Sequence, residues 1–396
     1  MTRNRHSGIS SSNTDSSYNL IKNNTIVSNC IYASWDSAGV SFSHSTCTNN
    51  VIMNNVILKN NLVNNNTQGI YHEGANAIIY GNIVGGYDTN GINPGGLATN
   101  TIVSFNTCFG SDPASYFSGI ATNGSSTVIR ENTVFANRHG IRLLNNADSN
   151  IILNNTTVKN LSYGIYLNSA NPNFTDNNKI YNNISAYNAT SGIFADGGTA
   201  GNAADFNFYY GNGTDISNNF GETHSIVTAG VTSFGFNAND SGTADATSST
   251  TMILDAGQGW TANMWQGLGV KITISGTDYW AGIISNTSDK LFIYPPLGAT
   301  PANGDAFIIT DFTPAGTTLT AETPIGQGCR ADKTTEPGTV NIGAVTDYVK
   351  NTTDTKVFGS LQSAHDDAGL SASDTVTSYS IDEVASGTIG ATITDN

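Results

Sequence analysis

The chain has 396 residues, and its 15 lysines and arginines are outnumbered by 30 aspartates and glutamates, giving a formal net charge of −15 at pH 7. This balance argues against nucleic acid and against an anionic membrane as partners, because both would repel the protein. No apolar run is long enough to span a bilayer, and none of the four cysteines forms a CxxC pair that would predict a zinc site. We therefore expect no membrane span and no metal site of this kind.

Two columns of residues recur in step through the first half of the chain. In the first column a glycine precedes a β-branched residue, at intervals that run from 21 residues (Gly119 to Gly140) to 31 residues (Gly8 to Gly39). The glycines of this column are Gly8, Gly39, Gly69, Gly91, Gly119, Gly140, Gly164 and Gly192. The second column consists of Asn24, Asn55, Asn82, Asn106, Asn132, Asn155, Asn183 and Asn207. A period of this length predicts a solenoid of stacked coils.

Each coil of such a solenoid contributes short strands that pair in parallel with the coils on either side. The β-branched residues point inward and stack on one another, which buries apolar area at roughly 25 cal/mol per Å². Glycine allows the chain to turn a corner, and asparagine at a fixed corner hydrogen-bonds the backbone of the next coil. A leucine-rich repeat has a similar period, but it requires Leu at several fixed positions, and the inward positions here are Ile and Val. We therefore expect an all-β fold.

From Gly8 to about Tyr210 these repeats resemble the right-handed parallel β-helix proteins of the pectate-lyase-like and phage tailspike-like superfamily. The resemblance implies a right-handed parallel β-helix solenoid, which we place at residues 1–240. It says much less about function, because the same fold carries lyases, hydrolases, epimerases and spikes without activity.

The hydrophobicity pattern of the sequence changes near residue 241. Between 241 and 310, short runs of alternating hydrophobicity are separated by turn residues, which predicts a small inserted module of the β-barrel or β-sandwich type. The segment 311–345 resembles the C-terminal wrap of secreted β-helix proteins, through Thr323–Gly328 and Asn341–Ala344. Residues 346–396 are acidic and lack a clear period, so we expect a tail or the start of a further element there.

The side chain two residues after each corner glycine is expected to face outward, because its neighbour faces inward. This row contains Tyr71, Arg142, Tyr166 and Phe194. These side chains would line a groove in which sugar rings stack on the aromatic residues and Arg142 binds a carboxylate. Ordinary cross-coil packing under a loop is the alternative interpretation.

The densest group of ionisable residues is Arg130, Glu131, Arg138, His139 and Arg142. A polysaccharide lyase needs a cation that neutralises a uronate carboxylate and a base that takes the C5 proton, and Arg and His can serve in these roles. These five residues are therefore the candidate catalytic group. The alternative is a structural pair of Arg130 with Glu131.

A second polar group lies earlier in the chain, where His72 and Glu73 follow Tyr71 in a tight turn. Stacked coils rise by about 4.8 Å each, which places this turn roughly 10 to 15 Å from the arginine and histidine group along the solenoid axis. The two groups would then contact different sugars of one glycan. A solvated turn is the alternative.

Aromatic residues are concentrated in the predicted module, where Trp260, Trp265 and Trp280 would form a sugar platform if exposed, or part of the core if buried. The loop Asp196–Asp205 offers oxygen ligands that would suit Ca²⁺, or it forms a wide loop without metal. No other cofactor is expected.

Two functions follow from the resemblance. The first is an extracellular protein that engages a polysaccharide, as a lyase, a hydrolase or an epimerase acting on a uronate-containing glycan. The second is a phage tailspike, a fibre or another surface protein that binds glycan without catalysis, as a homotrimer or with another assembly partner. Arg3 and Arg5 precede no apolar stretch, so the start of the sequence predicts no signal peptide. We expect a removed leader, a shortened sequence or release by lysis, and hence an extracellular or virion-surface location.

Overall fold

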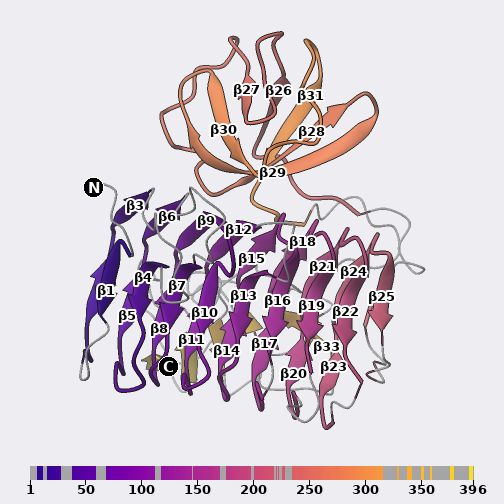
Figure 1. The fold of residues 1–396 in the computed structure, drawn as a ribbon. Helices are drawn as coiled ribbons and strands as arrows, with labels where there is room; N and C mark the ends of the chain where they lie inside the picture. Colours follow the sequence, from indigo (N-terminus) through magenta and orange to yellow (C-terminus); the bar gives the residue numbers. More distant parts are fainter. Residues whose placement is uncertain are drawn as a thin grey trace.

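The computed structural model describes residues 7–314, except for 12–15, 28–37, 59–67, 112–116, 145, 170–174, 198–199, 218–219, 221, 223–224 and 228–233. Beyond residue 314 it describes only the backbones of six short strands. The predicted all-β parallel β-helix is confirmed, because the described residues contain strands and no helix, and the strands of successive coils stack into three parallel sheets (Figure 1).

Each coil contributes one strand to each sheet, and we name the sheets A, B and C in chain order. Sheet A contains β1 (Ile9–Ser11), β4 (Ala38–Phe42), β7 (Gln68–His72), β10 (Ile92–Pro94), β13 (Ser118–Thr122), β16 (His139–Leu143), β19 (Tyr163–Leu167), β22 (Ser191–Ala195) and β25 (Thr214–Ser217). Sheet B contains β2 (Leu20–Lys22), β5 (Val51–Met53), β8 (Ile78–Tyr80), β11 (Ile102–Ser104), β14 (Val128–Arg130), β17 (Ile151–Leu153), β20 (Lys179–Tyr181) and β23 (Ala203–Asp205). Sheet C contains β3 (Thr25–Val27), β6 (Val56–Leu58), β9 (Ile83–Tyr87), β12 (Thr107–Ser111), β15 (Thr133–Phe135), β18 (Thr156–Val158), β21 (Ile184–Ala186) and β24 (Phe208–Tyr210).

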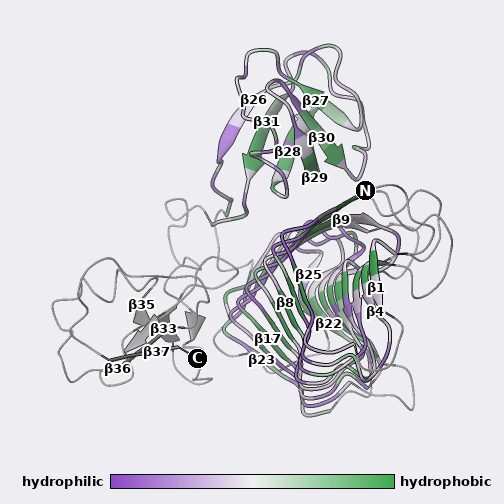
Figure 2. Ribbon diagram, turned by 90° about the vertical axis from the view of Figure 1, so that its left-hand side faces the viewer, coloured by the Kyte–Doolittle hydropathy of each residue, from purple (hydrophilic) through white to green (hydrophobic). Residues whose placement is uncertain are grey.

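The β-branched column predicted from the sequence forms the core of the solenoid. In sheet A, Ile141 pairs with Ile165, and Ile165 pairs with Ile193, so equivalent side chains lie directly above one another. All three are fully buried in a single hydrophobic cluster that runs along the solenoid. Figure 2, viewed nearly along the axis, shows the coils stacked in register.

The asparagine column forms a ladder at the corner between sheets B and C. Asn132 is a typical rung, because its Oδ1 accepts hydrogen bonds from the backbone N–H and the Nδ2 of Asn106 at 2.9 and 3.0 Å. Its own backbone N–H and Nδ2 donate to Oδ1 of Asn155 at 3.0 and 2.9 Å, and the same Nδ2 donates to the backbone oxygen of Val103 at 2.9 Å. Each rung therefore satisfies backbone groups that no strand partner reaches.

Two more asparagine stacks, which the sequence analysis did not identify, occupy the other corners. At the corner between sheets C and A, the backbone N–H of each of Asn137, Asn160 and Asn188 donates to the Asn side chain of the next coil, ending at Asn212. At the corner between sheets A and B, the equivalent stack runs through Asn150, Asn178 and Asn202. In this part of the solenoid, asparagine side chains support all three corners.

The inserted module is a six-stranded antiparallel sheet. Its strands, in sheet order, are β26 (Asp240–Thr243), β31 (Ala306–Thr310), β28 (Gly269–Ile274), β29 (Thr277–Asn286), β30 (Lys290–Tyr294) and β27 (Met252–Leu254). Ile253, Val270, Ile283, Leu291 and Phe307 belong to its buried core. The module thus has a hydrophobic core separate from that of the solenoid.

The module packs on the outer face of sheet C (Figure 1). Phe109 and Phe135 project from β12 and β15, stack with ring centroids 5.3 Å apart, and are fully buried. Phe312, which follows the last module strand, packs on Phe135 at a centroid distance of 4.5 Å. A Cβ atom on Gly282 of β29 would collide with the Phe109 ring, so the two units approach closely at this glycine.

Beyond residue 314, β32 (Gly328–Cys329) pairs with β33 (Pro337–Val340). A four-stranded sheet combines β35 (Val357–Phe358), β34 (Val349–Asn351), β36 (Thr375–Ser378) and β37 (Thr392–Asp395). The wrap predicted for 311–345 and the tail predicted for 346–396 lie mostly outside the described residues.

The asparagine ladder leads to a first prediction, that Asn132→Ala destabilises the solenoid. The substitution leaves the backbone N–H of Asn106 and the backbone oxygen of Val103 buried without these partners, and each such group costs roughly 1–3 kcal/mol. We expect the free energy of unfolding, measured by urea denaturation, to fall by about 3 kcal/mol. Asn24→Ala at the half-exposed first rung is the control and should cost less than about 1 kcal/mol. Equal losses would contradict a cooperative ladder.

The docking of the module leads to a second prediction, that Gly282→Ala weakens its contact with sheet C. Overpacking of this kind costs about 1–3 kcal/mol, because the added methyl must displace the Phe109 ring. In a double-mutant cycle with Phe109→Ala, the loss from Gly282→Ala should largely disappear. Gly259→Ala, where an added Cβ meets open space, is the matched control in the same module. Additive losses in the cycle would contradict the proposed contact.

Candidate functional site

The expectation that the recurring glycines turn corners is wrong for Gly140 and Gly164, which lie inside strands of sheet A without positive φ. A Cβ there would collide with a backbone oxygen of the next coil, so glycine is required for the close approach of the coils. The outward row predicted after these glycines is continuous in the C-terminal half of sheet A. Arg142 on β16 pairs in register with Tyr166 on β19, and Tyr166 pairs with Phe194 on β22. The Arg142 guanidinium carbon lies 5.4 Å from the centre of the Tyr166 ring. Successive strands therefore place one side chain each on a common outer surface.

Two further rings pack against this row, and we call His139, Tyr163, Tyr166 and Phe194 the sheet A aromatic cluster. Tyr163 stacks nearly parallel to Phe194, with centroids 4.5 Å apart and an interplanar angle of 8°. His139 also stacks on Tyr163, with centroids 5.2 Å apart and an interplanar angle of 10°. Tyr163 was missed by the sequence analysis, which considered only positions after the corner glycine; it directly precedes Gly164, as His139 precedes Gly140.

A polar network borders the cluster. The Tyr166 hydroxyl donates to Oδ2 of Asp196 at 2.8 Å, and Asn168 Nδ2 donates to the same carboxylate oxygen at 2.8 Å. Arg142 Nη2 donates to Oδ1 of Asn168. Burial and the hydrogen bond to Asp196 raise the pKa of Tyr166 well above its ordinary value. Tyr166 is therefore a neutral hydrogen-bonding group at physiological pH.

His139 is held in its neutral form. Its side chain is only 1% exposed. Burial, reinforced by the nearby charges of Arg142 and Arg138, lowers the pKa of His139 to about 3. An imidazole with so low a pKa is a weak proton acceptor at neutral pH.

The coil geometry divides the group of five ionisable residues that are neighbours in sequence. His139 and Arg142 lie on β16 of sheet A, with Arg138 directly before them. Arg130 ends β14 of sheet B, and its Nε lies 3.4 Å from Oε2 of Glu131, whose side chain is 1% exposed. The structure therefore brings together Arg138, His139 and Arg142, and places the Arg130–Glu131 pair at a different corner.

The side chains of Tyr71 and Glu73 lie nearer the surface, and the side chain of His72 is buried. The Tyr71 hydroxyl donates to Glu73 at the surface, and β7 lies three strands from β16, or roughly 14 Å. His72 instead points into the core, fully buried, with its Nε2 3.2 Å from Asn50 Nδ2. Burial lowers the pKa of His72 to about 4.

The three module tryptophans occupy different environments. Trp260 is 7% exposed in the module core, and its Nε1 donates to Oδ2 of Asp240 at 2.7 Å. Trp265 packs against the same core. Trp280 stacks on Phe312 at 5.7 Å and lines a cavity between the module and the solenoid. These positions do not form a common platform of three rings.

The described residues contain no group of three or more His, Cys, Asp or Glu side chains arranged to hold a metal ion. Asp196, at the start of the loop considered for Ca²⁺, is engaged by Tyr166, Asn168 and the backbone of Ser169. In the same part of the chain, no helix has the length and hydrophobicity that a membrane crossing requires.

Comparison with solved structures finds similarity to an epimerase, a tailspike protein and a viral protein. The periplasmic alginate epimerase AlgG is 17% identical with a TM-score of 0.36 over 52% of this chain and 48% of the epimerase. The Dettilon tailspike protein is 13% identical with a TM-score of 0.33, over 75% of this chain and 85% of the tailspike. ORF18 of Geobacillus virus E2 is 12% identical with a TM-score of 0.32, over 72% and 64%.

By its own three stacked parallel sheets, the chain is a parallel β-helix protein. At these identities and TM-scores no property of these proteins transfers to this chain, which spans about half the length of the epimerase. No protein-family model and no curated protein matches the sequence. The candidate site therefore depends on the geometry of the chain itself.

The buried histidines predict a loss of stability in acid. The folded pKa values of His139 and His72, about 3 and about 4, lie below the value of about 6.5 expected in the unfolded chain. The stabilisation is complete above about pH 6.5 and is lost progressively as the pH falls from there to the folded values, because in this window the unfolded chain binds more protons. Between pH 7 and pH 5 each histidine should cost roughly 2 kcal/mol.

The test is urea denaturation at both pH values, for the wild type and for His139→Phe. The variant keeps an aromatic ring but cannot be protonated, so its loss of stability between pH 7 and pH 5 should be smaller by roughly 2 kcal/mol. An identical loss in both proteins would show that His139 is not kept neutral by the fold.

Proposed function

We propose that the protein binds an extended polysaccharide along the outer face of sheet A, outside the cytoplasm or on a virion surface. The observation that supports this most is the pair of partly exposed, nearly parallel rings of Tyr163 and Phe194 on neighbouring strands. Aromatic faces pack against the C–H faces of sugars, and polar groups at their edge bind hydroxyls. Here Asn168 and Asp196 supply those polar groups.

The local charge favours a glycan that carries carboxylates. The charges of Arg138 and Arg142 both lower the pKa of His139, so two cations lie beside the aromatic cluster. A guanidinium binds a carboxylate through charge-assisted hydrogen bonds. With a net charge of −15, the rest of the chain would repel a polyanion, so binding would be confined to this region.

The geometry supports binding more strongly than cleavage. A lyase or an epimerase would need His139 to reach the C5 proton, and this side chain is 1% exposed with a pKa of about 3. A hydrolase would need a second carboxylate across the bond from Asp196. Tyr166, with its raised pKa, is a poor base. We therefore place non-catalytic binding first.

Lyase or epimerase activity is the second candidate, and one specific observation favours it. A neutral imidazole, His139, is close enough to Arg138 and Arg142 for both charges to act on it, so a base lies near groups that would neutralise a uronate carboxylate. This function would require Tyr163 to move away from the His139 ring.

The binding prediction is tested by affinity electrophoresis of the full chain in gels that contain alginate, polygalacturonate or uncharged dextran. We expect retardation by at least one uronate polymer. Phe194→Ala should weaken it about tenfold, because it removes a stacking surface worth roughly 1.4 kcal/mol. Tyr163→Ala should weaken it as well, because the Tyr163 ring stacks on Phe194 and holds it in place. Tyr18→Ala, which removes an aromatic side chain that is 81% exposed at the end of the solenoid, is the matched control.

The same polymers distinguish the two candidate functions. Ultraviolet absorbance of an unsaturated product would reveal a lyase, and proton NMR of the uronate ratio would reveal an epimerase. Turnover that disappears in His139→Gln would establish catalysis over simple binding. Retardation that is unchanged in both Phe194→Ala and Tyr163→Ala would overturn the proposed site on sheet A.

A further inference from the structure

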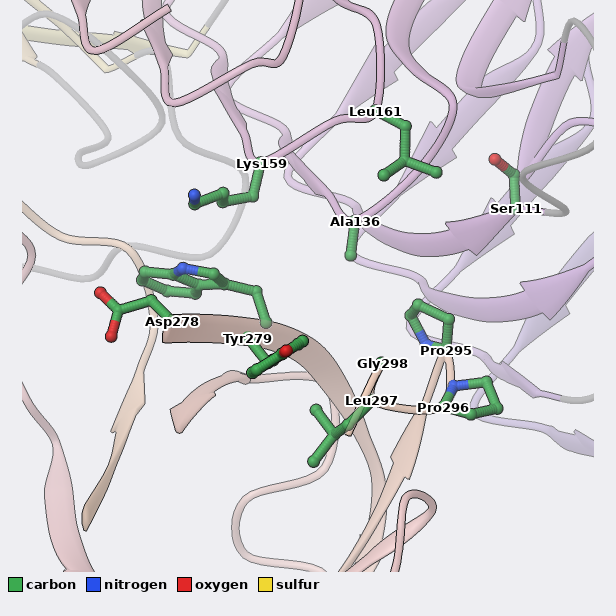
Figure 3. A pocket seen from close by; sticks show the side chains of 11 residues that line it. Ser111, Ala136, Lys159, Leu161, Asp278, Tyr279, Pro295, Pro296, Leu297 and Gly298 are labelled. Carbon is green, nitrogen blue, oxygen red and sulfur yellow. The ribbon is translucent and has the colours of Figure 1, made fainter. Parts of the chain in front are cut away.

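A groove separates the module from the corner between sheets C and A. Its larger cavity, about 300 Å³, is bordered on the solenoid side by Lys159 and Leu161, and on the module side by Tyr279 and Leu297 (Figure 3). A second cavity of about 200 Å³ shares Lys159, Asp278 and Trp280 with the first. We call the two cavities together the inter-unit groove.

Both signs of charge lie on the groove. Lys159 is half-buried, its Nζ lies 5.5 Å from the centre of the Tyr187 ring, and burial lowers its pKa. Asp278 accepts a hydrogen bond from Thr273 Oγ1 at 2.6 Å and lies 3.4 Å from Lys271 Nζ. The negative charge of Asp278 partly opposes the lowering of the Lys159 pKa. The groove therefore contains a cation and an anion that are close enough to interact.

Trp280 adds a hydrogen-bond donor to the groove. Its ring stacks on Phe312 with an interplanar angle of 26°, and its side chain lines both cavities. The Nε1 atom is buried and has no hydrogen-bond acceptor among the described residues. A buried N–H without an acceptor costs free energy, and a shift of the indole ring toward the groove would let a ligand oxygen recover it.

We propose that the inter-unit groove binds a single uncharged sugar ring. A sugar hydroxyl both accepts and donates, so one ligand can accept from Trp280 and Lys159 and donate to Asp278. Its C–H face matches the aromatic and apolar side chains of Tyr279 and Leu161. A carboxylate would be repelled by Asp278, and an amine by Lys159. The volume is at the lower end of small-molecule sites, which run from about 300 to 1,000 Å³.

This site is separate from the sheet A aromatic cluster and is made by both structural units. It does not depend on the polysaccharide proposal, because none of the four cluster residues lines either cavity. Variants of the groove and of sheet A therefore test the two sites independently.

The experiment is an NMR titration of the full chain with ¹⁵N-labelled tryptophan. The chain has four tryptophans, so four indole N–H signals are expected, and the Trp280 signal is assigned by its loss in Trp280→Phe. The probes are the methyl glycosides of glucose, galactose, mannose and N-acetylglucosamine, with methyl glucuronate glycoside as the charged comparison. At least one uncharged glycoside should shift the Trp280 signal saturably.

The variants measure which groups bind. Asp278→Asn, at an exposed position that should leave the fold intact, should weaken the titrated affinity about three- to tenfold, and Trp280→Phe, followed by ligand-observed NMR, about tenfold. Trp265→Phe is the matched control, because its buried Nε1 also lacks an acceptor among the described residues, but it lines neither cavity. Phe194→Ala should leave this binding unchanged.

Three outcomes would overturn the proposal. The first is the absence of any saturable shift at Trp280 with all four uncharged glycosides. The second is equal weakening by Trp265→Phe and Trp280→Phe, which would indicate a general effect on the module. The third is tighter binding of the glucuronate, which would contradict an uncharged ligand.

Discussion

The hydrogen bond from one coil's backbone N–H to the asparagine Oδ1 of the next coil constrains the rest of the structure. At a corner the chain leaves one sheet before entering another, so its amides lack strand partners there. The ladder from Asn24 to Asn207 supplies those acceptors once per coil. A slip of one residue would break several bonds and turn the inward row outward. The outer row that carries Arg142, Tyr166 and Phe194 is straight because the corners are fixed.

What the sequence predicted well is what recurs once per coil. The isoleucine column and one asparagine column keep phase, and both form stacks along the solenoid. The stacks through Asn137 and Asn150 were not predicted, because asparagine does not occupy every rung. Thr127, for example, takes the place of asparagine in the coil before Asn150. Tyr163 escaped for another reason. Strict alternation along β19 places Tyr163 on the same face as the inward Ile165, yet its ring stacks on the ring of Phe194 in the outward row.

The parts that could not be predicted depend on contacts between distant residues. Arg130 and Arg142 are close in sequence, yet the coil places them on sheets B and A. Trp280 belongs to the module, and only the packing of Phe312 and Phe109 against β29 shows that it faces the solenoid. Lys159 belongs to no sequence motif. Its role at the groove depends on its interaction with Asp278, a residue more than a hundred positions later. Periodicity carries no information about how the module docks.

The distribution of charge connects the two proposed sites. The chain has only 15 lysines and arginines, and four of them form two local pairs, Arg138 with Arg142 near His139, and Lys159 with Lys271 at the groove. On a protein with a net charge of −15, such a local concentration orients an anionic polymer more than it tightens binding. At the groove, Asp278 balances Lys159, so an uncharged ring is compatible there. A glycan that carries both acidic and neutral sugars is therefore the chemistry that would satisfy both surfaces at once.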